Sequence, residues 1–91
     1  MGHKLLKVKI FGTVQGVFFR HSARIEFEEL GIKGFARNES DGSLSLEAEG
    51  KEEALGKLLE WCKKGPPLAK VEKIEFSFHD ATGQFKDFEI K

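Results

Sequence analysis

The sequence has one cysteine, no tyrosine and no excess of charge of either sign. Because Cys62 is alone, the chain cannot form an internal disulfide or a metal site built from several thiolates. Its 15 basic and 15 acidic side chains balance, so no excess positive field attracts a nucleic acid or an acidic membrane surface. No apolar run approaches the roughly 20 residues needed to cross a bilayer, and no apolar signal segment opens the sequence. These absences predict a cytoplasmic globular domain that binds neither nucleic acid nor membrane.

What the sequence does contain is a regular spacing of apolar side chains. A period of two predicts strands at residues 6–10, 43–49, 74–78 and 88–90, and a further strand is predicted at residues 33–38. Apolar side chains spaced three or four residues apart predict helices at residues 19–30 and 51–64. Gly31 is a natural C-terminal cap for the first helix, and Pro66 and Pro67 end the second. Asp41 and Gly42 mark a tight hairpin turn, because glycine tolerates the positive φ that such a turn needs.

The resulting order, β-α-β-β-α-β with a short final strand, predicts an α+β fold of the ferredoxin-like, split β-α-β kind. In this sandwich two helices pack on one face of a four- to five-stranded, mainly antiparallel sheet. Strands joined through one helix run the same way, so the C-terminal ends of the first two strands lie on the same side of the sheet. We therefore expect the 12–20 loop, the start of the first helix and Asn38 to be neighbours. No linker or repeat divides residues 1–91, which favours a single domain.

The loop at residues 12–20, with the sequence Gly-Thr-Val-Gln-Gly-Val-Phe-Phe-Arg, joins a strand to a helix N-terminus. Such a junction offers backbone N–H groups without partners and the positive end of the helix dipole. Gly12 and Gly16 allow the curvature that turns successive amides inward, and Arg20 ends the loop with a planar fork that can hold two anion oxygens. The pattern favours a site for a small anion such as phosphate or sulfate. The alternative is an ordinary glycine turn beside a solvated arginine.

Asn38 is the only asparagine in the chain and ends the predicted second strand. Its carboxamide carries a donor and an acceptor, which suits holding a water molecule in a fixed direction. Asparagine also caps turns well, and the pattern leaves both roles open.

Other polar side chains beside this loop are weaker candidates. His21 should point about 100° away from Arg20 around the helix. Ser22 is expected to help cap the first helical turn, since no base is placed to activate it as a nucleophile. Arg24 and Arg37 are expected to form surface ion pairs.

Residues 12–20 resemble the acylphosphatase signature G-x-V-Q-G-V-x-F-R. Residues 34–42, Gly-Phe-Ala-Arg-Asn-Glu-Ser-Asp-Gly, resemble the second motif of that family, G-[W/F]-x-x-N-x-x-D-G. Segments 61–71 and 88–90 are also similar to it, so the resemblance covers essentially the whole chain. Three positions depart from the family pattern and bear on packing or substrate preference, not on the reacting positions: Thr13, Phe35 and Phe85.

The resemblance implies hydrolysis of acyl phosphates, such as carbamoyl phosphate or 1,3-bisphosphoglycerate, to a carboxylate and inorganic phosphate. Arg20 and the loop amides would bind the phosphoryl group, and Asn38 would orient the attacking water. No protein base, metal or cofactor is needed if a phosphoryl oxygen takes the proton of the water. The expected partners are a small acyl phosphate and phosphate- or sulfate-like anions, and the expected state is a monomer. The loop amides implied are those of Val14, Gln15, Gly16, Val17, Phe18, Phe19 and Arg20.

Two alternatives of other classes compete with the enzyme. RNA-recognition domains share the element order, and residues 33–36 imitate the opening of their RNP1 motif. However, Arg37 and Asn38 replace its aromatic continuation, and the segment lies on the second strand instead of the third. The other alternative is a non-catalytic phosphate-binding or regulatory domain, like the acylphosphatase-like segment of larger carbamoyl-transferring maturation enzymes. The length of 91 residues weighs against that alternative.

Overall fold

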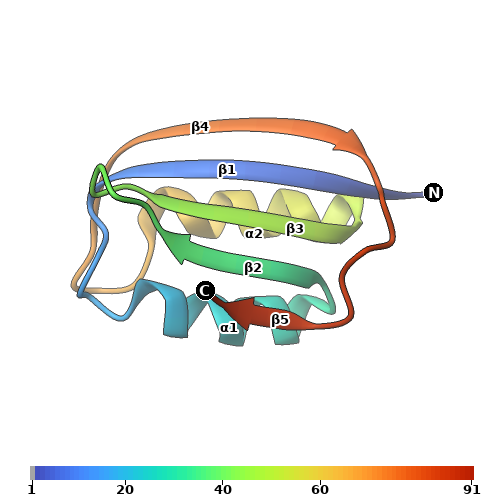
Figure 1. Ribbon diagram of the computed structural model, residues 1–91, viewed down its shortest axis with the longest axis horizontal. Coiled ribbons are helices and arrows are strands. Elements are labelled where there is room, and N and C mark those ends of the chain that lie inside the picture. The colour runs from blue at the N-terminus through green and yellow to red at the C-terminus, as the bar shows by residue number, and fades with distance from the viewer. Residues whose placement is uncertain (1) are drawn as a thin grey trace.

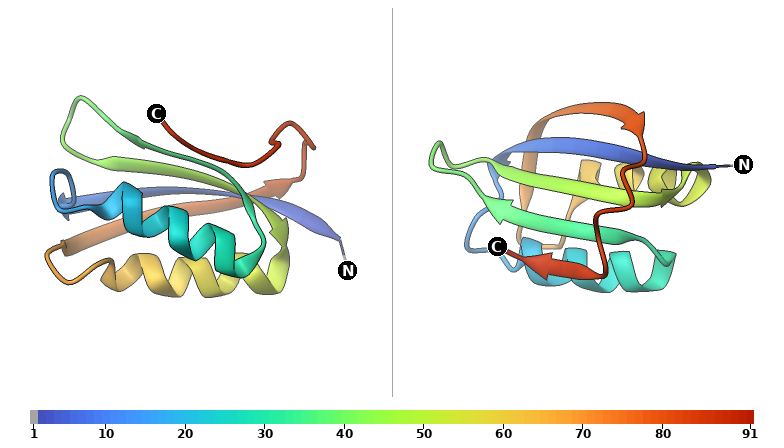
Figure 2. Two further views of the ribbon diagram at one scale, coloured as in Figure 1. Left: turned by 90° about the horizontal axis from the view of Figure 1, so that it is seen from below. Right: turned by 45° about the vertical axis from the view of Figure 1, so that its right-hand side comes forward.

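Alternating apolar side chains give each central strand one face that must be buried, and two amphipathic helices cover that face. The computed structural model describes residues 2–91 and has two layers, with the helices on one face of the sheet (Figure 1, Figure 2). Its strands are β1 (His3–Thr13), β2 (Lys33–Asn38), β3 (Leu44–Lys51), β4 (Lys70–Asp80) and β5 (Phe88–Ile90). Its helices are α1 (Phe19–Leu30) and α2 (Glu52–Lys64).

The strands lie in the order β4-β1-β3-β2-β5 across the sheet. β3 lies between β1 and β2 and is antiparallel to both, β4 is antiparallel to β1, and β5 is parallel to β2. The predicted α+β, ferredoxin-like fold is therefore confirmed, in its five-stranded form. Because β1 and β2 are both antiparallel to β3, they run in the same direction, and their C-terminal ends lie at the same end of the sheet.

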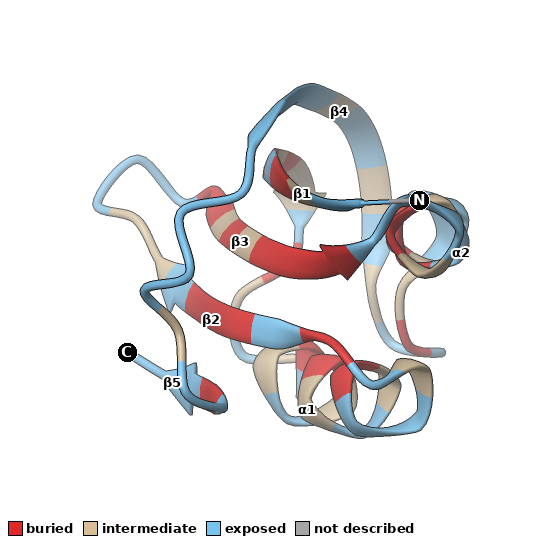
Figure 3. Cartoon of the chain, turned by 90° about the vertical axis from the view of Figure 1, so that its right-hand side faces the viewer, coloured by how far each residue is buried: buried red, intermediate tan, exposed pale blue. Residues whose placement is uncertain are grey.

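The core lies between the sheet and the helices, and Figure 3 shows its buried residues concentrated on the central strands and the inward sides of the helices. The register places Val8 of β1 opposite Leu46 of β3, so that both side chains face this core. The rings of Phe27 and Phe88 lie 4.4 Å apart and pack the short strand β5 onto α1. Burial of such side chains, at roughly 2 kcal/mol each, is the main stabilising contribution of the fold.

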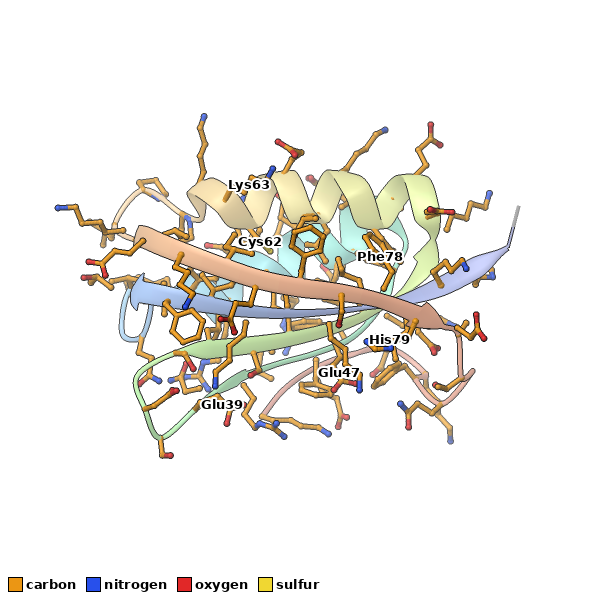
Figure 4. The ribbon with its side chains drawn as sticks, turned by 90° about the horizontal axis from the view of Figure 1, so that it is seen from above. Glu39, Glu47, Cys62, Lys63, Phe78 and His79 are labelled. Carbon is orange, nitrogen blue, oxygen red and sulfur yellow. The ribbon has the colours of Figure 1, made fainter. Side chains whose placement is uncertain are left out.

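The edge strand β4 is longer than the 74–78 segment that periodicity predicts, because it runs from Lys70 to Asp80. Most of its side chains are exposed, so hydrogen bonding to β1 extends it beyond the stretch that buries apolar groups. Figure 4 shows Phe78 on the side of β4 that faces α2 and His79 on the opposite side. An edge strand of this kind has no clear hydrophobic alternation at its ends.

Glu49 is the one acidic side chain that the structure buries within residues 2–91. Its carboxylate accepts hydrogen bonds from the backbone N–H and the hydroxyl of Thr82 and from the backbone N–H of Gly83. These contacts fix the segment between β4 and β5 against β3. Burial acts to raise the pKa of Glu49, but the hydrogen bonds outweigh it and hold the pKa below its usual value.

Replacing Glu49 with glutamine is expected to lower the free energy of unfolding at pH 7 by about 1–2 kcal/mol, because charge-assisted hydrogen bonds are lost. A lowered folded-state pKa stabilises the protein above the ordinary value of 4.5, and this contribution is lost as the pH falls below it. Urea unfolding at pH 7 and pH 3 measures both effects. Glu47→Gln on the same strand is the control; an equal loss in both variants, or a Glu49→Gln effect that is no smaller at pH 3 than at pH 7, would contradict the assignment.

Candidate functional site

The β1–α1 loop, the start of α1 and the end of β2 meet around a cavity, at the end of the sheet where β1 and β2 terminate. Its volume is about 280 Å³. The structure thus brings Arg20 and Asn38 into one site, as the shared direction of β1 and β2 predicts. The residues that line the cavity are Val14, Gly16, Phe18, Phe19, Arg20, His21, Asn38 and Ile90.

The loop gains its curvature from backbone conformations that favour glycine. Gly12, with φ 130°, lies at an irregularity in the β1–β4 pairing, and a Cβ there would lie 2.1 Å from the carbonyl oxygen of Lys70. Gly16 and Phe18 have φ values of 74° and 63°, both in the left-handed region. Left-handed residues at alternate positions allow neighbouring N–H groups to turn toward one side, as in an anion-binding concavity.

The N-terminus of α1 receives no hydrogen bond from the side chain of Phe18, its N-cap residue. The first turn also holds no acidic residue. The expected capping role of Ser22 is therefore wrong: its backbone N–H donates to the carbonyl oxygen of Phe18, 3.0 Å away, as part of the helix. A helix start without a side-chain cap and without an acidic group leaves its partial positive charge available to an anion from solution.

The side chain of Gln15 ties the loop to the β2–β3 turn. Its Nε2 atom donates to the carbonyl oxygens of Glu39 and Ser43, at 2.8 and 2.9 Å. Glu39 directly follows Asn38, so these bonds fix the loop relative to that carboxamide. Sequence reasoning assigned only the backbone amide of Gln15 to the site. The side-chain contact joins residues 24 and 28 positions apart, and no local pattern predicts it.

Gln15→Ala is expected to weaken inhibition by inorganic phosphate about fivefold and to lower the free energy of unfolding by about 2 kcal/mol, since two neutral hydrogen bonds are lost and each contributes about 1 kcal/mol. Steady-state inhibition constants and urea unfolding measure the two effects. Gln84→Ala, at an exposed glutamine in the segment before β5, is the matched control. Unchanged phosphate inhibition in Gln15→Ala would show that the loop keeps its shape without these bonds.

Arg20, half-buried at the start of α1, is positioned by the last strand. Its Nη1 atom donates to the main-chain oxygen of Lys91, 3.2 Å away. Lys91 in turn donates its backbone N–H to the carbonyl oxygen of Ala36, at 2.8 Å. The pairing of β5 with β2 therefore places the acceptor that holds the guanidinium, which is a role for β5 that the sequence does not indicate.

The Oδ1 atom of Asn38 is buried and has no hydrogen-bond partner among residues 2–91. Asn38 does not close the turn that follows it. Instead, the Oδ1 atom of Asp41 accepts hydrogen bonds from the backbone N–H and the hydroxyl of Ser43, at 2.9 and 2.5 Å. These bonds lower the pKa of Asp41 to about 2. Because an unsatisfied buried carbonyl costs about 1–3 kcal/mol, the orphaned oxygen of Asn38 points to a partner from solution.

Three weaker candidates from the sequence, Arg37, Arg24 and His21, have no assigned role in the proposed reaction. Arg37 forms an ion pair with Glu39, at 3.0 Å, as expected of a surface arginine. The ion pair expected for Arg24 is not formed within residues 2–91; its guanidinium instead lies over the ring of Phe88, 5.4 Å from the ring centre. His21 lies in the cavity wall.

Residues 2–91 contain no group of three or more histidine, cysteine or acidic side chains placed to hold a metal ion. No helix in this part of the chain is long and apolar enough to cross a membrane.

The acylphosphatase family model matches residues 6–90, which include the loop, Arg20 and Asn38. The chain belongs to the acylphosphatase family. An acylphosphatase from Thiobacillus denitrificans is 45% identical over 86 residues, which are 94% of each chain. The crystal structure of acylphosphatase from Bacillus subtilis is 31% identical and superposes with a TM-score of 0.92, covering 97% of this chain and 98% of that one.

One similar structure belongs to a much larger protein. Full-length HypF in its phosphate- and nucleotide-bound form is 28% identical, with a TM-score of 0.89. It matches over 99% of this chain but only 12% of its own. Membership in the acylphosphatase family, with relatives matched over nearly their full length, favours the enzyme over both alternatives.

Proposed function

We propose that this protein hydrolyses the carboxyl–phosphate bond of acyl phosphates, releasing a carboxylate and inorganic phosphate, without a metal ion or other cofactor. The observation that carries the proposal is that Asn38, whose Oδ1 atom is buried without a hydrogen-bond partner, lines one cavity together with Arg20 and the start of α1. The start of α1 and Arg20 suit an anion, and Asn38 has an unused acceptor.

In the binding step, the phosphoryl oxygens accept hydrogen bonds from the loop amides and from the guanidinium of Arg20. The amides are fixed by the backbone and Arg20 by Lys91, so these donors need little rearrangement when charge redistributes in the transition state. The amides proposed are those of Val14, Gln15, Gly16, Val17, Phe18, Phe19 and Arg20.

In the chemical step, a water molecule donates a hydrogen bond to Oδ1 of Asn38 and attacks phosphorus. The new bond joins the water oxygen to phosphorus, and the bond from phosphorus to the acyl oxygen breaks with its electron pair on the carboxylate. A phosphoryl oxygen takes the proton of the water. A carboxylate is a good leaving group, so the protein need not supply a strong acid, and its contribution is orientation and charge stabilisation.

The proposal extends to the state of the protein. We assign residues 1–91 to one acylphosphatase-like domain that acts as a monomer in the cytoplasm. Its partners are then small acyl phosphates and phosphate- or sulfate-like anions, and it needs neither a nucleic acid nor a membrane. The balance of 15 basic and 15 acidic side chains supports this set of partners.

Steady-state hydrolysis of benzoyl phosphate, with phenyl phosphate as the unactivated monoester, tests the function. We expect turnover of benzoyl phosphate that is unchanged by EDTA and competitively inhibited by inorganic phosphate, with little turnover of phenyl phosphate. Loss of activity in EDTA would contradict the metal-free mechanism. Absence of benzoyl phosphate hydrolysis, together with salt-sensitive retention on single-stranded RNA, would favour the RNA-binding alternative.

A further inference from the structure

Phe18 combines two unfavourable features at the edge of the cavity. It is the one non-glycine residue with a positive φ among residues 2–91, at 63°, and its side chain is 70% exposed. A glycine would adopt this conformation without strain, and a polar side chain would be better solvated. Strained backbone of this kind concentrates at functional sites, and an exposed aromatic ring next to a cavity offers a contact surface for a ligand.

A second exposed apolar side chain lines the same cavity from another part of the chain. Ile90 is 37% exposed and belongs to β5, which packs beside α1 (Figure 1). The other large apolar lining residues, Val14 and Phe19, are each 1% exposed and cannot present a surface to a ligand. Phe18 and Ile90 are therefore the apolar surface that the cavity offers at its mouth.

The proposed reaction determines which part of the substrate reaches this surface. The phosphoryl oxygens face the loop amides and Arg20, and the attacking water lies at Asn38. In-line displacement places the leaving acyl group on the side of phosphorus opposite the water, so the acyl group is the part of the substrate that these polar groups do not hold. Besides Arg20, His21 is the sole titratable side chain among the lining residues. The mouth therefore has few groups that could bind a charged acyl group.

We propose that Phe18 and Ile90 form an acyl subsite, which selects acyl phosphates whose acyl group is apolar and bulky, aromatic or branched aliphatic, over small acyl groups such as acetyl. The inference rests on the proposed hydrolase function and adds its substrate class. Contact with the ring of Phe18 and the side chain of Ile90 removes apolar surface of the acyl group from water, and this contribution is absent for acetyl phosphate.

The test compares kcat/KM for benzoyl phosphate with kcat/KM for acetyl phosphate in each variant. The ratio of the two values reports the effect of the acyl group alone, because damage to the phosphoryl-binding loop lowers both values together. Phe18→Ala and Ile90→Ala are each expected to lower this ratio about tenfold relative to the unmodified protein. Phe18→Leu, which keeps an apolar side chain, is expected to retain most of the preference.

Phe76→Ala is the matched control, since Phe76 is 52% exposed on β4, at the opposite edge of the sheet from β5. Its ratio is expected to stay unchanged. An unchanged ratio in both Phe18→Ala and Ile90→Ala, with hydrolysis of both substrates retained, would overturn the acyl subsite and leave the proposed function standing. Hydrolysis of neither substrate by the unmodified protein would overturn the function and the subsite together.

Discussion

Replacing Arg20 with alanine is expected to lower kcat/KM for benzoyl phosphate about a thousandfold, because a single arginine placed on a transferring phosphoryl group contributes on that scale. The same change should weaken competitive inhibition by inorganic phosphate at least tenfold, since phosphate and the phosphoryl group occupy one cradle. Steady-state kinetics with phosphate as the inhibitor measures both quantities. A large loss of turnover with unchanged phosphate inhibition would contradict the binding role of Arg20.

Two further variants test whether the loss in Arg20→Ala comes from the planar shape of the guanidinium, from its charge alone or from a general disturbance of α1. Arg20→Lys keeps the charge but loses the planar fork and the aligned contact with Lys91, so it should recover only part of the activity. Arg24→Ala, one helical turn further along and stacked over Phe88, is expected to retain near-normal kinetics. A similar loss in Arg24→Ala and Arg20→Ala would indicate that α1, not the guanidinium, is what the first variant disturbs.

Replacing Asn38 with alanine is expected to reduce kcat for benzoyl phosphate about a hundredfold to a thousandfold while phosphate inhibition changes less than about threefold. We propose that the carboxamide holds the attacking water and not the phosphoryl group, so turnover and anion binding should separate. Measurement of kcat and of the phosphate inhibition constant in the same assay tests this. Parallel loss of both quantities would show that Asn38 belongs to the anion cradle.

Because the oxygen of Asn38 has no partner, we also expect a particular effect of its removal on stability. Asn38→Ala removes a buried acceptor that no group within residues 2–91 satisfies, so the free energy of unfolding should stay the same or rise. Asn38→Gln keeps the carboxamide but displaces it by one methylene, and kcat should still fall because position is what matters. Clear destabilisation of Asn38→Ala in urea unfolding would instead assign a structural, turn-capping role.

The direction of the strands could be predicted from the sequence because it follows from local patterns. Period-two alternation marks β1 and β3, and a single helix between β1 and β2 requires them to run the same way. That one consequence places the loop after β1 beside Asn38. The ends of β4 could not be predicted, because an edge strand extends through hydrogen bonds to β1 and buries little apolar surface there.

The details that organise the site depend on contacts between distant residues. Gln15 reaches the β2–β3 turn, and Arg20 reaches Lys91 at the far end of the chain. Neither contact has a local sequence signal, since both require the fold to be complete. The sequence also does not show that Asp41, and not Asn38, accepts the side-chain hydrogen bonds of the turn, because that contact depends on the folded geometry.

A crystal structure with inorganic phosphate bound tests the central claim most directly. We predict that the anion lies in the cavity at the start of α1, accepts hydrogen bonds from the amides of residues 14–20 and from Arg20, and has an ordered water between it and Oδ1 of Asn38. Phosphate bound elsewhere with this cavity empty, or bound here with Asn38 turned away from the water, would contradict the account.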